Sequence, residues 1–178
     1  MTDTFPRQYW IKTCLETDEW RVIKLIGRQR FLENSRAGTI NLKVRNDLTK
    51  DLSRFEADTL AAEFVVAKWL NVYPDITFHP RKGGCDLAVN GLRIDVKYAK
   101  PLTYNLCTST LKNETSSDIY VLVLGEHPDL YIAGWCWSWQ FINPANLHHG
   151  ERGATDYYLY PRGKLYHMDA LAGALESK

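Results

Sequence analysis

The chain has 178 residues, the usual size of one globular domain that buries a substantial core. Hydrophobic residues make up 45% and charged residues 24% of the sequence, which excludes a disordered or fibrous protein. The formal net charge of +1 excludes nucleic-acid binding through a uniformly basic surface, so such a partner would have to be held by a local patch.

The sequence carries no targeting or membrane signal. No apolar stretch is long enough to span a bilayer, and the N-terminal residues MTDTFPRQYW lack the basic and apolar regions of a secretory signal. The cysteines are scattered and form no CxxC pair, which favours free thiols in a reducing compartment over a zinc site. We therefore expect a cytoplasmic protein with no membrane partner; the cysteines are Cys14, Cys85, Cys107 and Cys136.

The N-terminal third predicts two helices joined by a polar connection. Thr17–Arg30 opens with a cap residue and two acids and then carries apolar residues at helical spacing. A short alternating piece at 39–44 predicts an extended connection or an edge strand. Asp58–Val72 is apolar on most faces, as expected for a helix buried against a sheet, and Glu63 is the one carboxylate inside its apolar run.

The middle of the chain predicts a tight β-hairpin. Residues 86–89 and 92–98 alternate as strands, and Asn90-Gly91 between them is a strong signal for a two-residue turn, since both turn positions need positive φ. Ile76–His79 is expected to form a strand before the hairpin.

The C-terminal half predicts further strands and a closing helix. The apolar run at 119–124 is typical of a strand covered on both faces. We expect strands at 131–141 and 157–166, a helix at 168–176, and a loop or helix in the polar run Thr103–Ser117.

These elements predict a single domain of the α/β class, with helices packed around a mixed β-sheet. It divides into an N-terminal helix and arm at about 1–55, a core at about 56–145, and a C-terminal strand and helix at about 146–178.

The hairpin brings chemistry-bearing side chains together. The turn places Asp86 opposite Asp95, and residues opposed in this way have Cβ atoms about 4.5–5.5 Å apart. Lys97 projects from the same face of the strand as Asp95. Two converging carboxylates favour a hard divalent cation such as Mg²⁺, which uses one or two carboxylates and keeps several waters. Glu63, on the adjacent helix, could complete the site.

This pattern predicts hydrolysis of a phosphodiester bond. The metal would polarise the phosphate, and Lys97 would orient or help to deprotonate the attacking water or stabilise the developing charge. Aspartates and lysines on strands are usually solvated surface, so an exposed charged hairpin is the plain alternative. The coincidence of an apolar helix with one Glu, a Gly-Gly-x-Asp segment, a tight hairpin and an Asp-x-Lys strand favours the functional interpretation.

The same residues resemble the PD-(D/E)xK nuclease superfamily, which includes restriction endonucleases, Holliday junction resolvases and many phage nucleases. The resemblance lies in AAEFVVAKWL with Glu63, GGCDLAVNG with Asp86, and LRIDVKYAK with Asp95 and Lys97. Cys85 replaces the Pro of the motif name, and Asp stands where Glu is commoner.

The resemblance implies a restriction endonuclease-like αβββαβ core with an N-terminal helical extension, and a phage or mobile-element DNA endonuclease dependent on Mg²⁺ or Mn²⁺. If the gene is phage-borne, the protein would act in the bacterial host cytoplasm. Asp86, Asp95 and the backbone carbonyl of Val96 would be metal ligands, Lys97 the catalytic lysine and Glu63 the helix acid.

A nucleic-acid partner, most simply DNA, needs cationic contacts. The candidates lie in the N-terminal arm and beside the predicted site: Arg28, Arg30, Arg36, Lys43, Arg45, Arg81, Lys82 and Lys100. The alternating Trp135–Trp139 stripe is interpreted first as core packing and second as a base-stacking platform. A homodimer is plausible, because cutting two strands often takes two active sites.

Two functions remain open on the sequence. One is an active metal-dependent endonuclease. The other is a catalytically inactive nuclease-like scaffold that binds nucleic acid or a protein partner.

Overall fold

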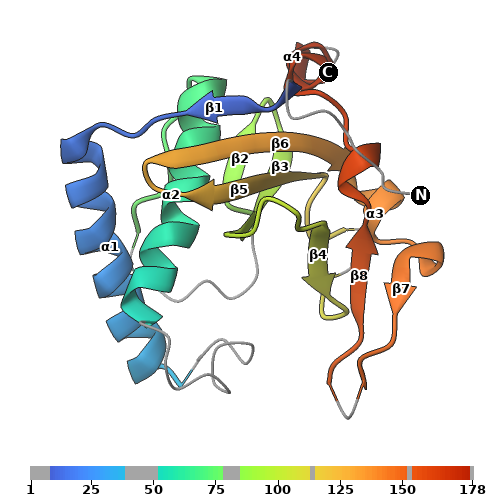
Figure 1. Ribbon diagram of the computed structural model, residues 1–178, viewed down its shortest axis with the longest axis horizontal. Coiled ribbons are helices and arrows are strands. Elements are labelled where there is room, and N and C mark those ends of the chain that lie inside the picture. Colours follow the sequence, from blue (N-terminus) through green and yellow to red (C-terminus); the bar gives the residue numbers. More distant parts are fainter. Residues whose placement is uncertain (1–8, 39–51, 78–84, 113–114, 152–153, 177–178) are drawn as a thin grey trace.

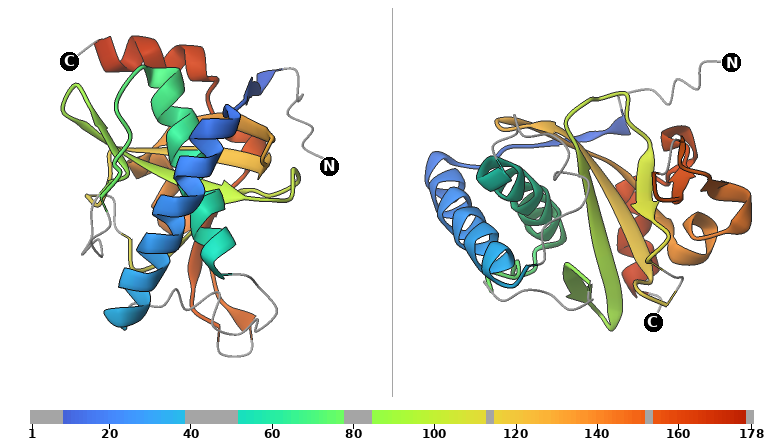
Figure 2. Two further views of the ribbon diagram at one scale, coloured as in Figure 1. Left: turned by 90° about the vertical axis from the view of Figure 1, so that its left-hand side faces the viewer. Right: turned by 90° about the horizontal axis from the view of Figure 1, so that it is seen from below.

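The computed structural model describes residues 9–38, 52–77, 85–112, 115–151 and 154–176. A five-stranded mixed sheet in the order β1-β6-β5-β3-β2 forms the centre of the fold. Helices α1 (Thr17–Arg36) and α2 (Leu52–Leu70) cover one face of this sheet, and a three-stranded sheet in the order β4-β8-β7 lies on the other side (Figures 1 and 2). The expected α/β class with a mixed sheet is confirmed.

The remaining elements are short. The central sheet contains β1 (Ile11–Thr13), β2 (Leu87–Val89), β3 (Leu92–Ala99), β5 (Ile119–Glu126) and β6 (Asp129–Trp137). The second sheet contains β4 (Leu106–Ser109), β7 (Leu147–His148) and β8 (Tyr157–Tyr160). The other helices are α3 (Ser138–Phe141), α4 (Met168–Glu176) and the 3₁₀ turns η2 (Pro144–Asn146) and η4 (Arg162–Lys164).

Helix α1 confirms the helix expected at Thr17–Arg30 and extends it to Arg36. The cap is Glu16 rather than Thr17, and the Glu19 carboxylate accepts a hydrogen bond from the Glu16 backbone N–H at 2.7 Å. The acids of the first turn thus satisfy donors that the helix itself cannot.

Helix α2 confirms the second expected helix but begins at Leu52, six residues earlier than predicted. It ends at Leu70, two residues before the predicted end, and the next residue, Asn71, has a left-handed φ of 54° that stops helical hydrogen bonding. Its apolar residues pack between α1 and the sheet, where fully burying one Leu or Val side chain contributes about 1.5–3 kcal/mol.

The predicted hairpin is confirmed. Leu87 pairs with Ile94 and Val89 with Leu92, and both turn residues have positive φ, 49° at Asn90 and 79° at Gly91. The ladder begins at Leu87, and the Asp86 N–H donates to the Ile94 carbonyl at 2.9 Å. The predicted pairing of Asp86 with Asp95 is therefore not part of the ladder.

The strand expected at Ile76–His79 is not formed at Ile76 and Thr77, which lie outside any strand, and 78–79 lie outside the described residues. The segment expected at 39–44 also lies outside the described residues.

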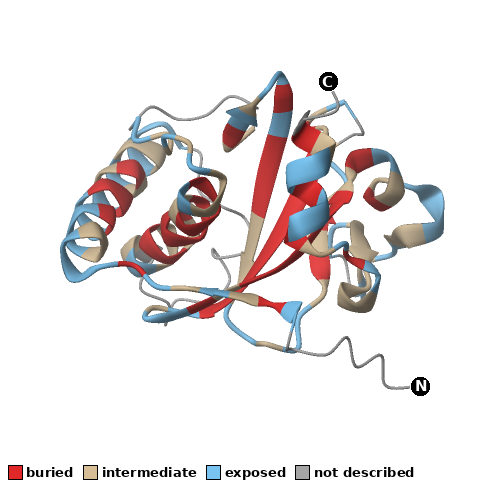
Figure 3. Cartoon of the chain, turned by 90° about the horizontal axis from the view of Figure 1, so that it is seen from above, coloured by how far each residue is buried: buried red, intermediate tan, exposed pale blue. Residues whose placement is uncertain are grey.

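Strand β5 confirms the strand covered on both faces and runs parallel to β3. Its residues from Ile119 to Gly125 are all buried, as the continuous red strand in Figure 3 shows. Ile119, Val121 and Val123 pack toward the helices, whereas the alternating side chains pack toward the second sheet: Tyr120, Leu122 and Leu124.

The connection between β3 and β5 differs from the expected αβββαβ order. A parallel pair needs a crossover, which is commonly a helix. Here residues 100–112 and 115–118 contain strand β4 and turns but no helix. Because β4 pairs with β8, this crossover builds the second sheet.

The C-terminal half follows the prediction in part. The strand expected at 131–141 ends at Trp137 and continues as α3, and the extended segment expected at 157–166 is a strand only to Tyr160. The closing helix α4 is confirmed. Trp135 is buried and contacts Trp137 edge to face with ring centroids 5.3 Å apart, which supports core packing, whereas Trp139 is exposed.

Gly27 allows the two long helices to approach closely. A Cβ built at this position would lie 2.7 Å from the backbone of Ala57. We predict that Gly27→Ala lowers the free energy of unfolding by about 1–3 kcal/mol, although alanine normally favours a helix by about 1 kcal/mol. Urea denaturation measures the change.

Gly173→Ala in α4 is the matched control, because nothing lies within 4 Å of its added Cβ. It should leave stability unchanged or raise it by up to about 1 kcal/mol. Equal effects of the two substitutions would contradict the close helix contact.

Candidate functional site

Asp95 and Lys97 lie on the face of β3 that points away from α2. Asp95 is opposite Tyr120 on β5, and Lys97 is opposite Leu122, in the register of the parallel pair. The Lys97 ammonium contacts one carboxylate oxygen of Asp95 and lies 5.7 Å from the centre of the Tyr120 ring. The predicted sharing of one face by Asp95 and Lys97 is observed.

A second lysine completes the surroundings of Asp95. Lys112, which follows β4 in the crossover, places its ammonium 2.8 Å from the other carboxylate oxygen. The Asp95 side chain is only 3% exposed, whereas those of Lys97 and Lys112 are 25% and 27% exposed. The carboxylate is therefore neutralised by two cations that remain in contact with solvent.

Asp86 lies beside the same strand. Its Oδ2 accepts a hydrogen bond from the backbone N–H of Val96 at 2.7 Å. This bond holds the Asp86 carboxylate against β3, at the residue that follows Asp95. Burial raises the pKa of the Tyr120 hydroxyl, and the negative charges of Asp95 and Asp86 raise it further. Asp86 is thus attached to the residue that follows Asp95 on β3.

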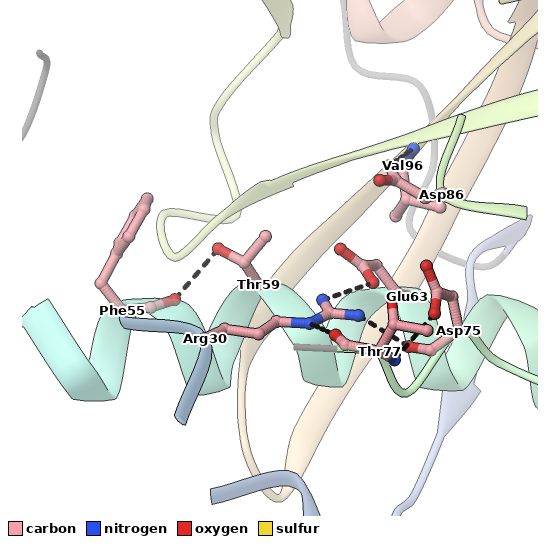
Figure 4. A network of polar contacts seen from close by, with 8 residues as sticks. All are labelled: Arg30, Phe55, Thr59, Glu63, Asp75, Thr77, Asp86 and Val96. Carbon is pink, nitrogen blue, oxygen red and sulfur yellow. Dashed lines mark hydrogen bonds and ion pairs between the residues drawn. The ribbon is translucent and has the colours of Figure 1, made fainter. Parts of the chain in front are cut away.

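Glu63 has a different environment. It is buried on α2, and its Oε2 lies 3.1 Å from the guanidinium of Arg30 on α1 (Figure 4). Arg30 also donates to the backbone carbonyl of Thr77 at 3.0 Å and to that of Asp75 at 2.7 Å. This pair therefore fastens α1, α2 and the segment after α2 to one another.

The structure divides the four predicted catalytic residues into two groups. Asp95 and Lys97 are in contact, and Asp86 is bound to the neighbouring Val96 N–H. Glu63 is held on the helix-covered side by Arg30 instead of pointing with Asp95 and Lys97 toward Tyr120.

Two of the predicted phosphate contacts have structural partners. Arg30 is buried, so its location does not expose it to a nucleic-acid backbone. Lys100 lies between two carboxylates, with its ammonium 3.2 Å from the buried Asp58 and 3.2 Å from the exposed Glu126. Burial works against its charge, but the two carboxylates raise the pKa of Lys100 above its ordinary value.

The other candidates are exposed or undescribed. Arg28 is exposed on α1, and Arg36 is exposed and paired with Glu33 at 2.7 Å. The remaining four lie outside the described residues: Lys43, Arg45, Arg81 and Lys82.

Two residues of this site were missed by the sequence analysis. Tyr120 lies inside an apolar run that predicts only a buried strand. Lys112 lies in the polar run Thr103–Ser117, where no local pattern predicts an approach to Asp95. The only available signal was the charge rule that a buried carboxylate requires cationic partners.

The donor chemistry fits a hard divalent cation. Asp86 and Asp95 supply carboxylate oxygens, and the Val96 carbonyl lies between Asp95 and Lys97 in the chain. No group of three His, Cys, Asp or Glu side chains suited to a metal occurs within the described ranges. Mg²⁺ does not require three, because it binds through one or two carboxylates and keeps several waters.

Comparison of the chain with protein-family models, with curated proteins and with solved structures finds no match. Within the part of the chain that the structure describes, no helix has both the length and the apolar character needed to cross a membrane.

Replacing Arg30 tests the structural role of the Arg30–Glu63 pair. Arg30→Met leaves a buried carboxylate without its cation, which costs about 3–5 kcal/mol, so we expect the free energy of unfolding to fall by that amount in urea denaturation. Arg30→Met combined with Glu63→Met should recover at least about 1 kcal/mol relative to Arg30→Met. A single variant within about 1 kcal/mol of wild type would contradict the pairing.

Proposed function

We propose that the protein is a divalent-metal-dependent nuclease of the PD-(D/E)xK type, acting most simply as a DNA endonuclease in phage or mobile-element DNA processing. The observation that carries the proposal is the buried Asp95 between two solvent-reaching lysines, beside the second carboxylate, Asp86. A buried carboxylate beside partly exposed ammonium groups is suited to a metal and an anionic phosphate.

Each described side chain of the site has a separate role in the proposed reaction. Asp86 and Asp95, with the Val96 carbonyl, would hold a divalent cation, which supplies Lewis-acid polarisation of the phosphodiester when bound. The Lys97 ammonium, positioned on Asp95 and above the Tyr120 ring, orients the attacking water or stabilises charge on the phosphate. Lys112 provides a second ammonium for a phosphate oxygen. Glu63 acts by holding the helices that support the sheet.

A second function, that of an inactive scaffold, is favoured by the two lysines on Asp95 and by the pairing of Glu63 with Arg30. Lys97 and Lys112 already neutralise Asp95 without a metal, and Arg30 engages Glu63. The same geometry therefore suits a catalytically inactive nuclease-like scaffold that binds nucleic acid or a protein partner. Cleavage assays separate the two functions.

Substitution at Asp95 and Lys97 tests the catalytic assignment. We expect wild-type protein with Mg²⁺ or Mn²⁺ to cut at least one of duplex, single-stranded or branched DNA. Asp95→Asn and Lys97→Ala should each lower the cleavage rate by at least about 100-fold, because each removes charge aimed at the reacting phosphate. Circular dichroism checks folding, and Lys164→Ala serves as an exposed-lysine control.

Unchanged cleavage by a folded Lys97→Ala protein would reject the site. Failure of the wild type to cut any substrate with either metal would reject the nuclease in favour of the scaffold.

Lys112 offers a test that does not depend on turnover. Its ammonium competes with any added cation for the Asp95 carboxylate. Lys112→Gln should therefore bind Mn²⁺ about tenfold more tightly than wild type in a calorimetric titration, because a repulsive charge is lost. Affinity that is unchanged or weakened would show that the cation binds elsewhere.

A further inference from the structure

A basic groove lies between the two long helices at the end of the sheet. It has a volume of about 720 Å³ and is lined from α1, from the first turns of α2 and from the turn between β5 and β6. Its lining contains four cationic side chains and no carboxylate: Arg21, Lys24, Arg28 and Arg54.

Two of these four cations are paired with carboxylates, and the other two are not. Arg21 is paired with Asp18 at 2.9 Å, and Arg54 lies 3.6 Å from Glu126. Within the described ranges, Lys24 and Arg28 form no ion pair, so the groove keeps a local positive charge in a protein of net charge +1. A local field of this kind attracts anions even when the whole molecule is nearly neutral.

The geometry of the groove suits an extended anion. Arg21, Lys24 and Arg28 lie three and four residues apart, on one face of α1, and span about 10 Å along the helix. That length matches the axial rise of about three nucleotides of one strand. The lining also contains Trp20 stacked on His127 with ring centroids 4.5 Å apart, and Lys24 lies 5.9 Å from the Trp20 ring.

A chain of ion pairs connects this groove to the strand of the candidate site. Arg54 contacts Glu126, which contacts Lys100, the residue after β3. Lys100 lies five residues beyond Asp95, about 16 Å along an extended strand. A duplex that extended along the strand from Lys100 to Asp95 would cover about five base pairs, since each adds 3.4 Å.

We infer that this groove, centred on Lys24 and Arg28, binds the phosphodiester backbone of a nucleic acid and guides it toward the end of β3. The inference rests on the proposed nuclease function for the choice of nucleic acid as the anionic polymer. Backbone binding by two ammonium or guanidinium groups is independent of sequence and strongly dependent on salt.

Binding to a fluorescein-labelled DNA duplex of about 24 base pairs tests the groove. Fluorescence anisotropy in EDTA excludes cleavage, and an RNA duplex of the same length distinguishes the two nucleic acids. Lys24→Gln/Arg28→Gln should weaken binding about tenfold and reduce the slope of log affinity against log salt by about two, as expected for two lost phosphate contacts.

The matched control removes two charges elsewhere on the surface. Lys12 is 51% exposed and lies 2.5 Å from Asp129, and Lys164 is exposed in η4; neither lines the groove. Lys12→Gln/Lys164→Gln lowers the net charge equally and should change the affinity by less than about twofold with an unchanged slope.

The outcomes separate the groove from the catalytic proposal. Equal losses in the two double variants, an unchanged slope in the groove variant, or no binding of either duplex by wild type would overturn the groove. A groove variant that binds normally while wild type cuts DNA would overturn the groove alone. A groove variant that loses binding in a protein that never cuts would support the groove and reject the nuclease.

Discussion

Removing a carboxylate from water costs several kcal/mol unless cations neutralise it, and Asp95 lies on a strand whose two faces are both covered. Lys97 comes from the same strand, but Lys112 comes from a crossover that also builds the second sheet. The same crossover therefore supplies both a strand of the second sheet and the Lys112 charge that neutralises Asp95.

The helix-covered side repeats the same constraint with different groups. Helix α1 buries Arg30 and helix α2 buries Glu63, and the two charges neutralise each other. The remaining donors of the guanidinium bind backbone carbonyls after α2, so the pair also fixes where the chain leaves that helix. Truncating either partner leaves a buried charge, which makes this contact stabilising only as a pair.

Local patterns were sufficient for the helices and the hairpin, because apolar periodicity and the Asn90-Gly91 turn are determined by neighbouring residues. The crossover strand β4 was not predictable in this way, since its partner β8 lies about fifty residues further on. Arg30 carried an unused signal: it continues the buried stripe of Ile23 and Ile26 at helical spacing. A charge on such a stripe predicts a buried partner, and Glu63 was the matching anomaly on α2.

The net charge of +1 does not show how the charges are distributed between the interior and the surface. Three of the buried polar residues are carboxylates, Asp58, Glu63 and Asp95, and each is held by a lysine or arginine. Such pairs contribute little to the field outside the protein, because opposite charges at contact distance cancel beyond a Debye length of about 8 Å. The field near α1 is then set by its own side chains, among which Lys24 and Arg28 face the groove. A net charge of +1 is therefore compatible with a nucleic-acid partner, provided that the contact is confined to such a patch.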